Sequence, residues 1–424
     1  MRPRLFLLLL LLSSSICYGQ KAIELKLGAE ASEFPAVGLS LEFDLPGEHV
    51  FSILGNKIRV FSTRDGTLVR EYSLPVRRDP NERVTKSVSS FYQRGQVSLA
   101  SGGKNLIVIC DAYMDREGSS EAVFLIDVED LTNGNDVSPV PILYPAEAEQ
   151  KPLRFVCSIG DDQFVFVTRN RTHNDQLLLY RLGDTRIDSK SVVELDSRAS
   201  RTPEYLCCGA FMTPLTYLLG SLQDGSSVEA LRVVPDREAN RSWQEMRCVG
   251  EKLSVFWNED GEGAIETGET YTLPSLPIAI SPNMNHHMIT LEQPINKLLY
   301  RQSIGIAEFD RPLRRTPTRS FIVEHNREMG RPGVWSRDST RFFVNDGNHS
   351  VRRRPRTISV HDASGAQVGI VSVGSGLSAE VVATSSDGDW IVTRNDLTKK
   401  PRPSSRSPEN YQSAVYTLWD LRRL

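Results

Sequence analysis

Oxygen-bearing side chains recur at alternate positions in the segment that begins at Asn258. Asp260 and Glu262 follow it, Gly263 comes next, and Glu269 lies six residues further on. Counted as a twelve-position loop, these residues fill positions one, three, five, six and twelve. A hard cation takes about six to eight oxygen ligands, and a tight turn gathers several of them from a short stretch. The segment is therefore a candidate calcium site.

The residues on either side of this loop do not resemble helices. Residues 253–257 and 270–273 are rich in apolar, aromatic and hydroxyl side chains and are expected to be strands, so an EF-hand pair is not predicted. The pattern is similar to the calcium-holding hairpin loops of integrin α-subunit propellers, a resemblance that would add Glu266 as a ligand. The alternative is an acidic hairpin tip in solvent without a metal.

Arginine is concentrated in the last third of the chain. Residues 301–424 hold 20 Lys and Arg against 13 Asp and Glu, a surplus of seven positive charges in a chain whose net charge is −3. The clustered candidates are Arg314, Arg315, Arg352, Arg353, Arg354 and Arg356. If they share one face, they would bind an anionic polysaccharide or an acidic protein surface. The alternative is a set of solvated loops that never converge. Nucleic acid is not an expected partner, since interleaved aromatic residues are lacking.

The elements that position these residues follow a repeat. A small or polar residue, a tight polar turn and a short apolar run recur with anchors near positions 44, 100, 158, 211, 281, 336 and 385, which are 49 to 70 residues apart. This spacing is near that of propeller blades. We therefore expect an all-β fold, a seven-bladed β-propeller of four-stranded antiparallel blades. The longest interval predicts an insertion at about 251–273.

The first and last repeats predict how the ring is closed. Residues 39–43, 50–54, 57–62 and 67–74 are expected to be the four strands of the first blade, because turn residues separate them. The last repeat ends at Leu424, just after its third strand. Residues 22–27 alternate in polarity and have no partner of their own. We expect this N-terminal strand to complete the last blade and close the ring.

The first residues have the pattern of an export signal. Arg2 and Arg4 precede an apolar run and a small polar stretch, which predicts a signal peptide over 1–19 and a single propeller domain over 20–424. Nothing else approaches the roughly 20 apolar residues that span a bilayer, so no transmembrane anchor is expected. A secreted or otherwise extracytoplasmic protein is predicted. Cys208 and Cys248 are a candidate disulfide there, and buried free cysteines are the alternative.

The repeat motifs resemble those of a known group of proteins. The Ser-x-Asp-Gly turn at Ser385 and the sequence Leu418-Trp419-Asp420-Leu421 are similar to WD-repeat and related secreted bacterial propellers. The resemblance covers nearly all of the chain after residue 19 and implies the fold alone. The Trp-Asp pair occurs only at 419–420 and no Gly-His pair begins a repeat, so no family active site is carried over.

The function that we expect is non-catalytic: a binding or scaffold propeller for a protein or polysaccharide partner. A propeller hydrolase or lyase with its site at the mouth of the central channel is the alternative. The seven histidines are scattered and no Gly-x-Ser-x-Gly elbow occurs. An enzyme should place several carboxylates or histidines along the channel, whereas a scaffold should line it with small or apolar residues.

Overall fold

The computed structural model describes most strands of the chain and the turns between them. The described residues are 21–25, 40–54, 56–76, 96–114, 118–143, 154–169, 175–183, 187–194, 216–221, 228–235, 248–273, 277–282, 286–294, 300–308, 319–325, 333–345, 355–375, 378–396 and 414–424. Position 211, Cys208 and the predicted signal peptide lie outside them. No helix among the described residues is long and apolar enough to cross a membrane.

The described strands form seven four-stranded antiparallel sheets, which confirms the all-β class and the four-stranded unit. Sheet 1 is β2 (Ser40–Phe43), β3 (His49–Leu54), β4 (Lys57–Ser62) and β5 (Leu68–Ser73); sheet 2 is β6 (Gln96–Ala100), β7 (Asn105–Met114), β8 (Gly118–Asp127) and β9 (Val140–Leu143); sheet 3 is β10 (Arg154–Ile159), β11 (Gln163–Arg169), β12 (Asp175–Leu182) and β13 (Ile187–Glu194); sheet 4 is β14 (Thr216–Ser221), β15 (Val228–Pro235), β16 (Cys248–Trp257) and β17 (Gly263–Leu273); sheet 5 is β18 (Pro277–Ile280), β19 (His286–Pro294), β20 (Tyr300–Glu308) and β21 (Arg319–His325); sheet 6 is β22 (Gly333–Trp335), β23 (Arg341–Asn345), β24 (Pro355–Asp362) and β25 (Gln367–Ser375); sheet 7 is β26 (Ser378–Thr384), β27 (Trp390–Asp396), β28 (Ala414–Asp420) and β1 (Lys21–Glu24). A short helix, α3 (Val128–Asn133), follows β8.

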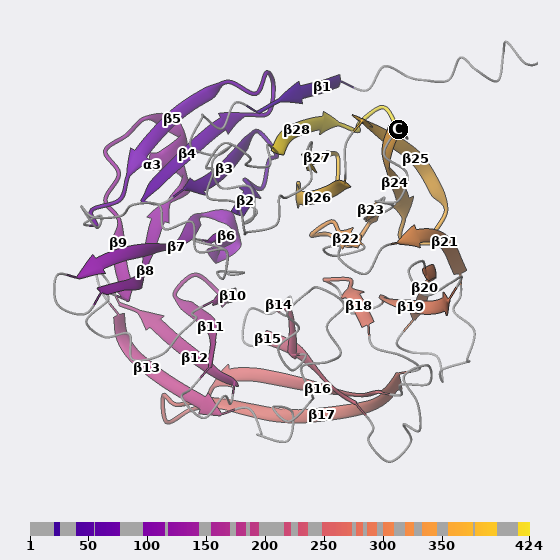
Figure 1. Ribbon diagram of the computed structural model, residues 1–424. Helices are drawn as coiled ribbons and strands as arrows, with labels where there is room; N and C mark the ends of the chain where they lie inside the picture. The colour runs from indigo at the N-terminus through magenta and orange to yellow at the C-terminus, as the bar shows by residue number, and fades with distance from the viewer. Residues whose placement is uncertain are drawn as a thin grey trace, which may run out of the picture.

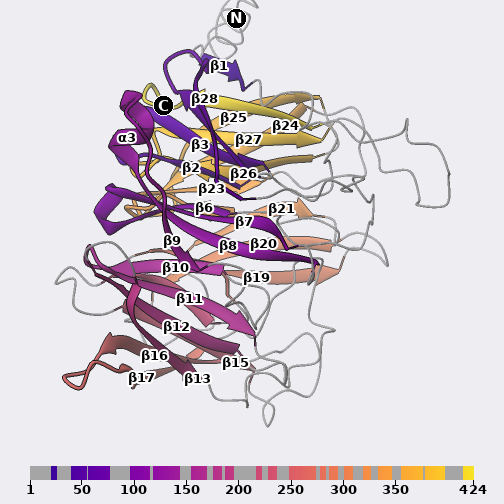
Figure 2. The same cartoon turned by 90° about the vertical axis from the view of Figure 1, so that its left-hand side faces the viewer.

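The sheets follow one another around a common centre, with the first strand of each sheet innermost (Figure 1). These first strands contact one another in a continuous series from β18 through β22, β26, β2, β6 and β10 to β14. Seen from the side, the strands run across the thickness of the molecule, and α3, the C-terminus and the tip of the β16–β17 hairpin lie at the same end (Figure 2).

The N-terminal strand belongs to the last sheet, as the sequence predicts. β1 pairs antiparallel with β28, from Lys21 opposite Asp420 to Glu24 opposite Thr417. The backbone N–H of Leu25 continues the ladder by donating to the carbonyl of Tyr416 at 2.9 Å. Leu25 is buried with Tyr416 in the apolar cluster between sheets 7 and 1. The first and last segments of the chain are therefore held in one sheet.

Apolar side chains lie between neighbouring sheets and not in one central core. Phe51 and Ile58 of sheet 1 pack on Val108 and Phe124 of sheet 2, and all four are at most 2% exposed. Similar clusters join sheet 2 to sheet 3, sheet 7 to sheet 1 and sheet 6 to sheet 7. Each sheet is thus stabilised by its neighbours, as in other repeat architectures.

Two features of the fourth sheet differ from the sequence prediction. β14 ends at Ser221, ten residues after the predicted anchor at 211. The stretch 251–273, predicted as an insertion, lies in β16 and β17 and in the turn between them. These are the third and fourth strands of the sheet, and at ten and eleven residues they are unusually long. The predicted insertion is therefore part of the sheet itself.

Candidate functional site

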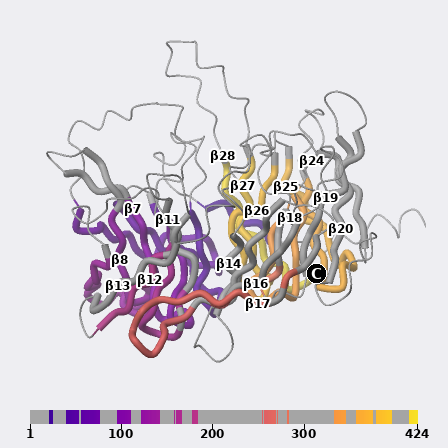
Figure 3. Tube along the Cα trace, turned by 90° about the horizontal axis from the view of Figure 1, so that it is seen from below, coloured from indigo at the N-terminus to yellow at the C-terminus, as the bar shows by residue number. Residues whose placement is uncertain are grey.

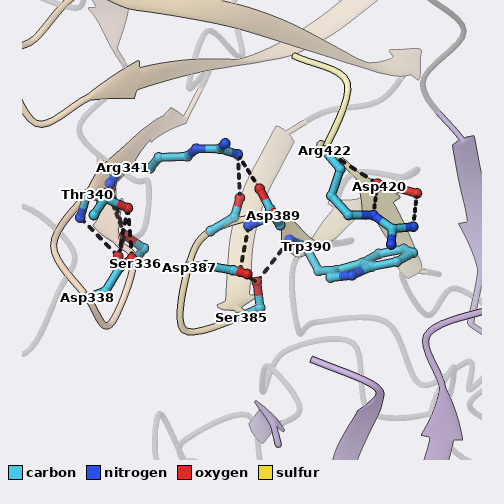
Figure 4. Close-up of polar contacts among 11 residues, drawn as sticks. Ser336, Asp338, Thr340, Arg341, Ser385, Asp387, Asp389, Trp390, Asp420 and Arg422 are labelled. Atoms are coloured by element: carbon cyan, nitrogen blue, oxygen red, sulfur yellow. Dashed lines mark hydrogen bonds and ion pairs between the residues drawn. The ribbon is translucent and has the colours of Figure 1, made fainter. Parts of the chain in front are cut away.

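The recurring turns are closed by their own polar side chains. In sheet 7, Ser385 Oγ donates to Asp387 Oδ1 at 2.6 Å and accepts from the backbone N–H of Trp390 at 2.9 Å. Asp387 Oδ1 also accepts from the backbone N–H of Asp389 at 2.9 Å. Gly388 has φ +71°, a conformation that glycine adopts without strain. The repeat motif of sheet 7 is therefore a hydrogen-bonded turn (Figure 4).

The same turn recurs in sheet 6 with the same spacing. Ser336 Oγ donates to Asp338 Oδ1 at 2.7 Å and accepts from the N–H of Arg341 at 3.0 Å. Asp338 Oδ1 accepts from the N–H of Thr340 at 3.0 Å. The position of Gly388 is taken here by Ser339, with φ +64°.

In sheet 1, Asp44 takes the place of the serine. Its Oδ1 accepts from the N–H groups of Glu48 and His49 at 2.7 and 3.0 Å, and its Oδ2 lies 2.8 Å from His49 Nδ1. The Asp44 carboxylate contacts three groups of its own turn, so its role is structural. The Asp–His pair is therefore assigned to the turn and not to catalysis.

Contacts between neighbouring turns join them into a belt. The N–H of Asp338 donates to the carbonyl of Ser386 at 2.9 Å, and Arg341 Nη1 lies 3.0 Å from Asp389 Oδ1. The belt continues from sheet 7 to sheet 1, where the Cβ position of Gly47 faces the Trp390 side chain at 3.4 Å. It reaches sheet 3 through Ser101, whose N–H donates to Ser158 Oγ at 2.8 Å. We call this side of the molecule the turn end, and the opposite side the loop end.

The residues that follow β28 contact the turns of this belt. Arg422 forms a fork on Asp420, with Nε to Oδ1 at 2.9 Å and Nη2 to Oδ2 at 2.6 Å, and its guanidinium lies 4.8 Å from the centre of the Trp390 ring. The hydrogen bond from Arg422 lowers the pKa of Asp420. Burial, followed by the charge of Asp387, raises the pKa of Asp389. Figure 4 shows these groups side by side.

The inner wall of the molecule carries few ionisable groups. The seven first strands that the structure describes contain two carboxylates, Glu42 and Glu380, one arginine, Arg154, and no histidine. Most of their other residues are apolar or small. Glu42 stands out, because burial raises its pKa to about 7 while the nearby Arg337 partly opposes that shift.

Sequence reasoning did not single out Glu42. The signal was present, since a glutamate stands between Leu41 and Phe43 in a four-residue strand, and both neighbours are buried. The packing partner that matters, β6, lies more than 50 residues further along the chain. A single sequence does not reveal that proximity.

The described histidine of sheet 6 is a packed core residue. His361 is 2% exposed and stacks on Phe342 with ring centres 4.7 Å apart. Its burial lowers its pKa, so the ring is neutral at pH 7. The backbone of His286 and His287 lies in β19, the second strand of sheet 5.

The structure separates the candidate calcium ligands. Asn258 to Glu262 form a tight turn, in which the N–H of Asn258 donates to the carbonyl of Glu262 at 2.8 Å and the N–H of Glu262 donates to Asn258 Oδ1 at 2.8 Å. Glu266 and Glu269 lie beyond the turn, in β17. An extended strand rises about 3.3 Å per residue, which puts the Glu269 backbone roughly 20 Å from the turn.

This geometry is a hairpin and not a twelve-residue loop that returns to its start (Figure 3). Glu259, Asp260 and Glu262 are exposed at its tip. Among the described residues, no group of three or more His, Cys, Asp or Glu side chains could hold a metal ion.

The candidate arginines belong to two different kinds of connection between strands. Arg314 and Arg315 lie outside the described residues, in the connection from β20 to β21, which joins a third strand to a fourth. Arg352, Arg353 and Arg354 also lie outside them, in the connection from β23 to β24, which joins a second strand to a third, and Arg356 is at the start of β24. In an antiparallel meander, these two kinds of connection lie at opposite ends. One shared arginine face stays a prediction, because the side chains of these arginines lie outside the described part of the chain.

Comparison with known proteins identifies no family. No family model matches the chain, and no curated protein matches it. Similar solved structures include a eukaryotic initiation factor, with TM-score 0.39 and 10% identity over 92% of this chain and 88% of the other. Others are a Dos1 propeller, with TM-score 0.39 and 11% identity over 91% and 78%, and an AfRom2 CNH domain, with TM-score 0.38 and 10% identity over 90% and 93%. The description as a propeller-like fold rests on the strand order and the arrangement of the sheets.

Proposed function

We propose that this chain is an exported, non-catalytic binding scaffold, a seven-bladed propeller closed through the pairing of β1 with β28. The signal-peptide pattern of residues 1–19 supports export. The seven described sheets act as the blades, and the strand that completes the last blade joins the two ends of the array. A closed array unfolds as one unit and holds its surface loops in fixed positions.

The observation that carries the proposal is the composition of the inner wall. The hydrolase or lyase alternative requires several carboxylates or histidines along the channel, and glycoside hydrolysis in particular uses a pair of carboxyl groups at a set separation. The described first strands supply only Glu42 and Glu380 as carboxylates. The polar side chains of the turns are engaged in holding the turns themselves. Both facts favour a scaffold over an enzyme.

The charge of the connections supports an anionic partner. Strand order assigns each connection to an end: first-to-second and third-to-fourth connections to the turn end, and the others to the loop end. Taken as the residues between strand bounds, the connections at the turn end carry a net charge of −10 and those at the loop end +8. When Arg422 and Arg423, which follow β28, are included, the net charge at the turn end is −8.

Several connections contribute to this separation. At the loop end, residues 397–413 hold four basic and one acidic residue, and residues 346–354 hold three arginines and one aspartate. At the turn end, residues 128–139 and 258–262 each hold three acidic residues and no basic one. An extended field of one sign attracts a partner of the opposite sign and orients it before contact. We therefore propose that an acidic polymer, such as an acidic polysaccharide, binds at the loop end.

The test is the binding of an acidic polysaccharide to residues 20–424 by isothermal titration calorimetry, with a neutral dextran of equal length as the control. We expect the acidic polymer alone to bind, with an affinity that falls steeply as salt is added, because at about 0.1 M salt the interactions between exposed charges are screened beyond roughly 10 Å. Equal binding of both polymers, or binding that salt does not weaken, would contradict the proposal.

A further inference from the structure

An arginine and a tryptophan from neighbouring sheets stack on one another at the turn end. Arg181 lies in β12 of sheet 3, and Trp257 is the last residue of β16 in sheet 4. The guanidinium carbon of Arg181 lies 5.2 Å from the centre of the Trp257 ring. The next strands of the two sheets, β13 and β17, are also in contact, and Figure 1 shows the hairpin of sheet 4 beside sheet 3. The stack therefore lies at the seam between sheets 3 and 4.

Two N–H groups of this stack are buried without an acceptor. Among the described residues, no group forms a hydrogen bond with Arg181 Nε or with the indole Nε1 of Trp257, although both atoms are buried. Each of these groups can only donate. A buried donor without an acceptor is costly, and such an atom calls for a water, an ion or a ligand that meets it. By contrast, the buried indole N–H of Trp419 donates to Thr393 Oγ1 at 2.8 Å.

The carboxylate of Asp162 faces Arg181 but does not hold it. Asp162 lies in the turn between β10 and β11, where its carbonyl accepts from the backbone N–H of Leu182 at 2.7 Å. Its Oδ2 is 3.9 Å from Arg181 Nε, which is too long for a hydrogen bond. The two side chains are 54% and 39% exposed, so their attraction is weak. The neighbouring Asp161 pairs with Lys104 of sheet 2. The N–H of Arg181 is thus left for another acceptor.

A second stack of the same kind at the turn end shows which acceptor suits such an arginine. The guanidinium of Arg422 lies 4.8 Å from the centre of the Trp390 ring. Both oxygens of Asp420 accept from it, from Nε at 2.9 Å and from Nη2 at 2.6 Å. A carboxylate matches the planar fork of an arginine, and the charges strengthen the hydrogen bonds. The stack of Arg181 has the same ring and the same guanidinium without this fork.

We propose that the seam between sheets 3 and 4 binds the carboxylate of a small ligand, with Arg181 and Trp257 as its donors. The carboxylate accepts from Arg181 Nε and from the indole N–H of Trp257. Two hydrogen bonds to a charged acceptor favour binding, whereas Asp162 and the exposed acidic tip of the hairpin repel the ligand, so the affinity is roughly millimolar. This site is at the turn end and does not rest on the proposed polymer surface at the loop end.

The experiment follows the side-chain N–H signals of residues 20–424 by NMR as sodium propionate is added. Sodium chloride at the same concentration and neutral glucose are the controls. We expect the signals of Arg181 Nε–H and Trp257 Nε1–H to move downfield and to saturate with propionate alone. The Nε–H of Arg422, whose acceptor is Asp420, is the matched control in the same spectrum and should not move. Binding of glucuronate supports the site equally, and tighter binding of glucuronate than of propionate would assign the ligand to the acidic sugars.

Two variants test the roles of the charged groups. Arg181→Lys keeps the positive charge but loses the fork, so propionate should bind roughly tenfold more weakly, as judged by the Trp257 Nε1–H signal. Asp162→Asn removes the like charge that lies 3.9 Å from Arg181 Nε, so propionate should bind roughly fivefold more tightly.

Signals of Arg181 and Trp257 that stay still in propionate would overturn the proposal. So would an equal shift in chloride or in glucose, or weaker binding of propionate to Asp162→Asn. If Arg181→Lys fails to fold, Trp257→Phe decides the question, because phenylalanine keeps an aromatic ring in the stack and removes only the indole N–H. In that variant, propionate should still move the Arg181 Nε–H signal but bind several-fold more weakly, and unchanged binding would exclude Trp257 as a donor.

Discussion

At the residue scale, one hydrogen-bonding scheme explains the turns of sheets 1, 6 and 7. A serine or aspartate accepts the backbone N–H five residues later, as Ser385, Ser336 and Asp44 do. The residue three positions after each of them has a positive φ, between +64° and +71°. Glycine fills that position in two of the three turns, and Ser339 fills it in sheet 6.

Replacement of Gly388 by alanine tests how tightly the turns of sheets 6 and 7 are packed. Its added Cβ would meet the Cβ and Cδ of Arg341 and the Cβ of Ser336, each at 3.2 Å, in a backbone with φ +71°. We expect Gly388→Ala to lower the free energy of unfolding by roughly 2 kcal/mol, from about 1 kcal/mol of backbone strain and a similar cost of contact. Urea denaturation measures the change.

The matched control for this variant is Gly374→Ala. Gly374 has φ +92° and nothing within 4 Å of its Cβ position, so alanine there adds backbone strain without a contact. An equal loss of stability in the two variants would show that the turns of sheets 6 and 7 are not tightly packed against one another.

The residue scale is also where sequence reasoning is least complete. The Ser-x-Asp spacing at Ser385 predicts the turn, because every partner lies within five residues. The surroundings of Glu42 depend on β6, which contacts β2 and begins at Gln96, 54 positions further along the chain. The local sequence pattern therefore predicts the turn at Ser385 but not the surroundings of Glu42.

At the scale of single elements, β1 is the strand whose removal is most informative. Its pairing with β28 and the burial of Leu25 tie the N-terminus to the last sheet. We expect a chain that begins at residue 28 to lose roughly 2 kcal/mol or more, the value of burying one leucine, and to self-associate through the exposed edge of β28. Thermal unfolding and light scattering measure the two effects.

Lys21→Ala is the control for this truncation, because Lys21 is exposed and its Nζ donates to the exposed carbonyl of Arg64. It should leave the thermal midpoint within about 1 °C, as exposed changes usually do. A truncated chain as stable and as monomeric as the full one would show that β1 does not close the array.

The β16–β17 hairpin gives a prediction about calcium. Because Glu269 lies far along β17 from the turn, we expect the same thermal midpoint in calcium and in EDTA. Asn258→Ala should lower stability by about 1 kcal/mol, since the N–H of Glu262 loses its acceptor, whereas Glu259→Ala at the exposed tip should not. A calcium-dependent rise that disappears in Asp260→Ala and Glu269→Ala would restore the twelve-position loop.

Element boundaries followed from sequence where turns are short. The strands of sheet 1 lie within one residue of their predicted bounds, because Gly47, Asn56 and Gly66 mark its turns. In sheet 4, the apolar run at Phe211 resembled a repeat anchor, while Ser221, Asp224 and Gly225 mark the end of β14. Apolar composition alone does not distinguish a strand from the segment before it.

At the scale of the whole molecule, the separation of charge is a property of topology. Acidic and basic connections are interspersed along the chain, so the sequence shows only a basic last third. Because neighbouring strands are antiparallel, strand order assigns successive connections to opposite ends of the sheets. The two pairs Arg314/Arg315 and Arg352/Arg353 have the same composition and are assigned to different ends.

The most direct test of the proposed function compares two double charge-reversal variants. The measurement is the affinity of each variant for an acidic polysaccharide. We predict that Arg352→Glu with Arg353→Glu, at the loop end, weakens binding roughly tenfold, about 0.7 kcal/mol for each of two exposed ion pairs. Arg314→Glu with Arg315→Glu, at the turn end, should bind as the wild type does. Equal weakening in both variants, or weakening confined to the turn-end pair, would contradict a binding surface at the loop end.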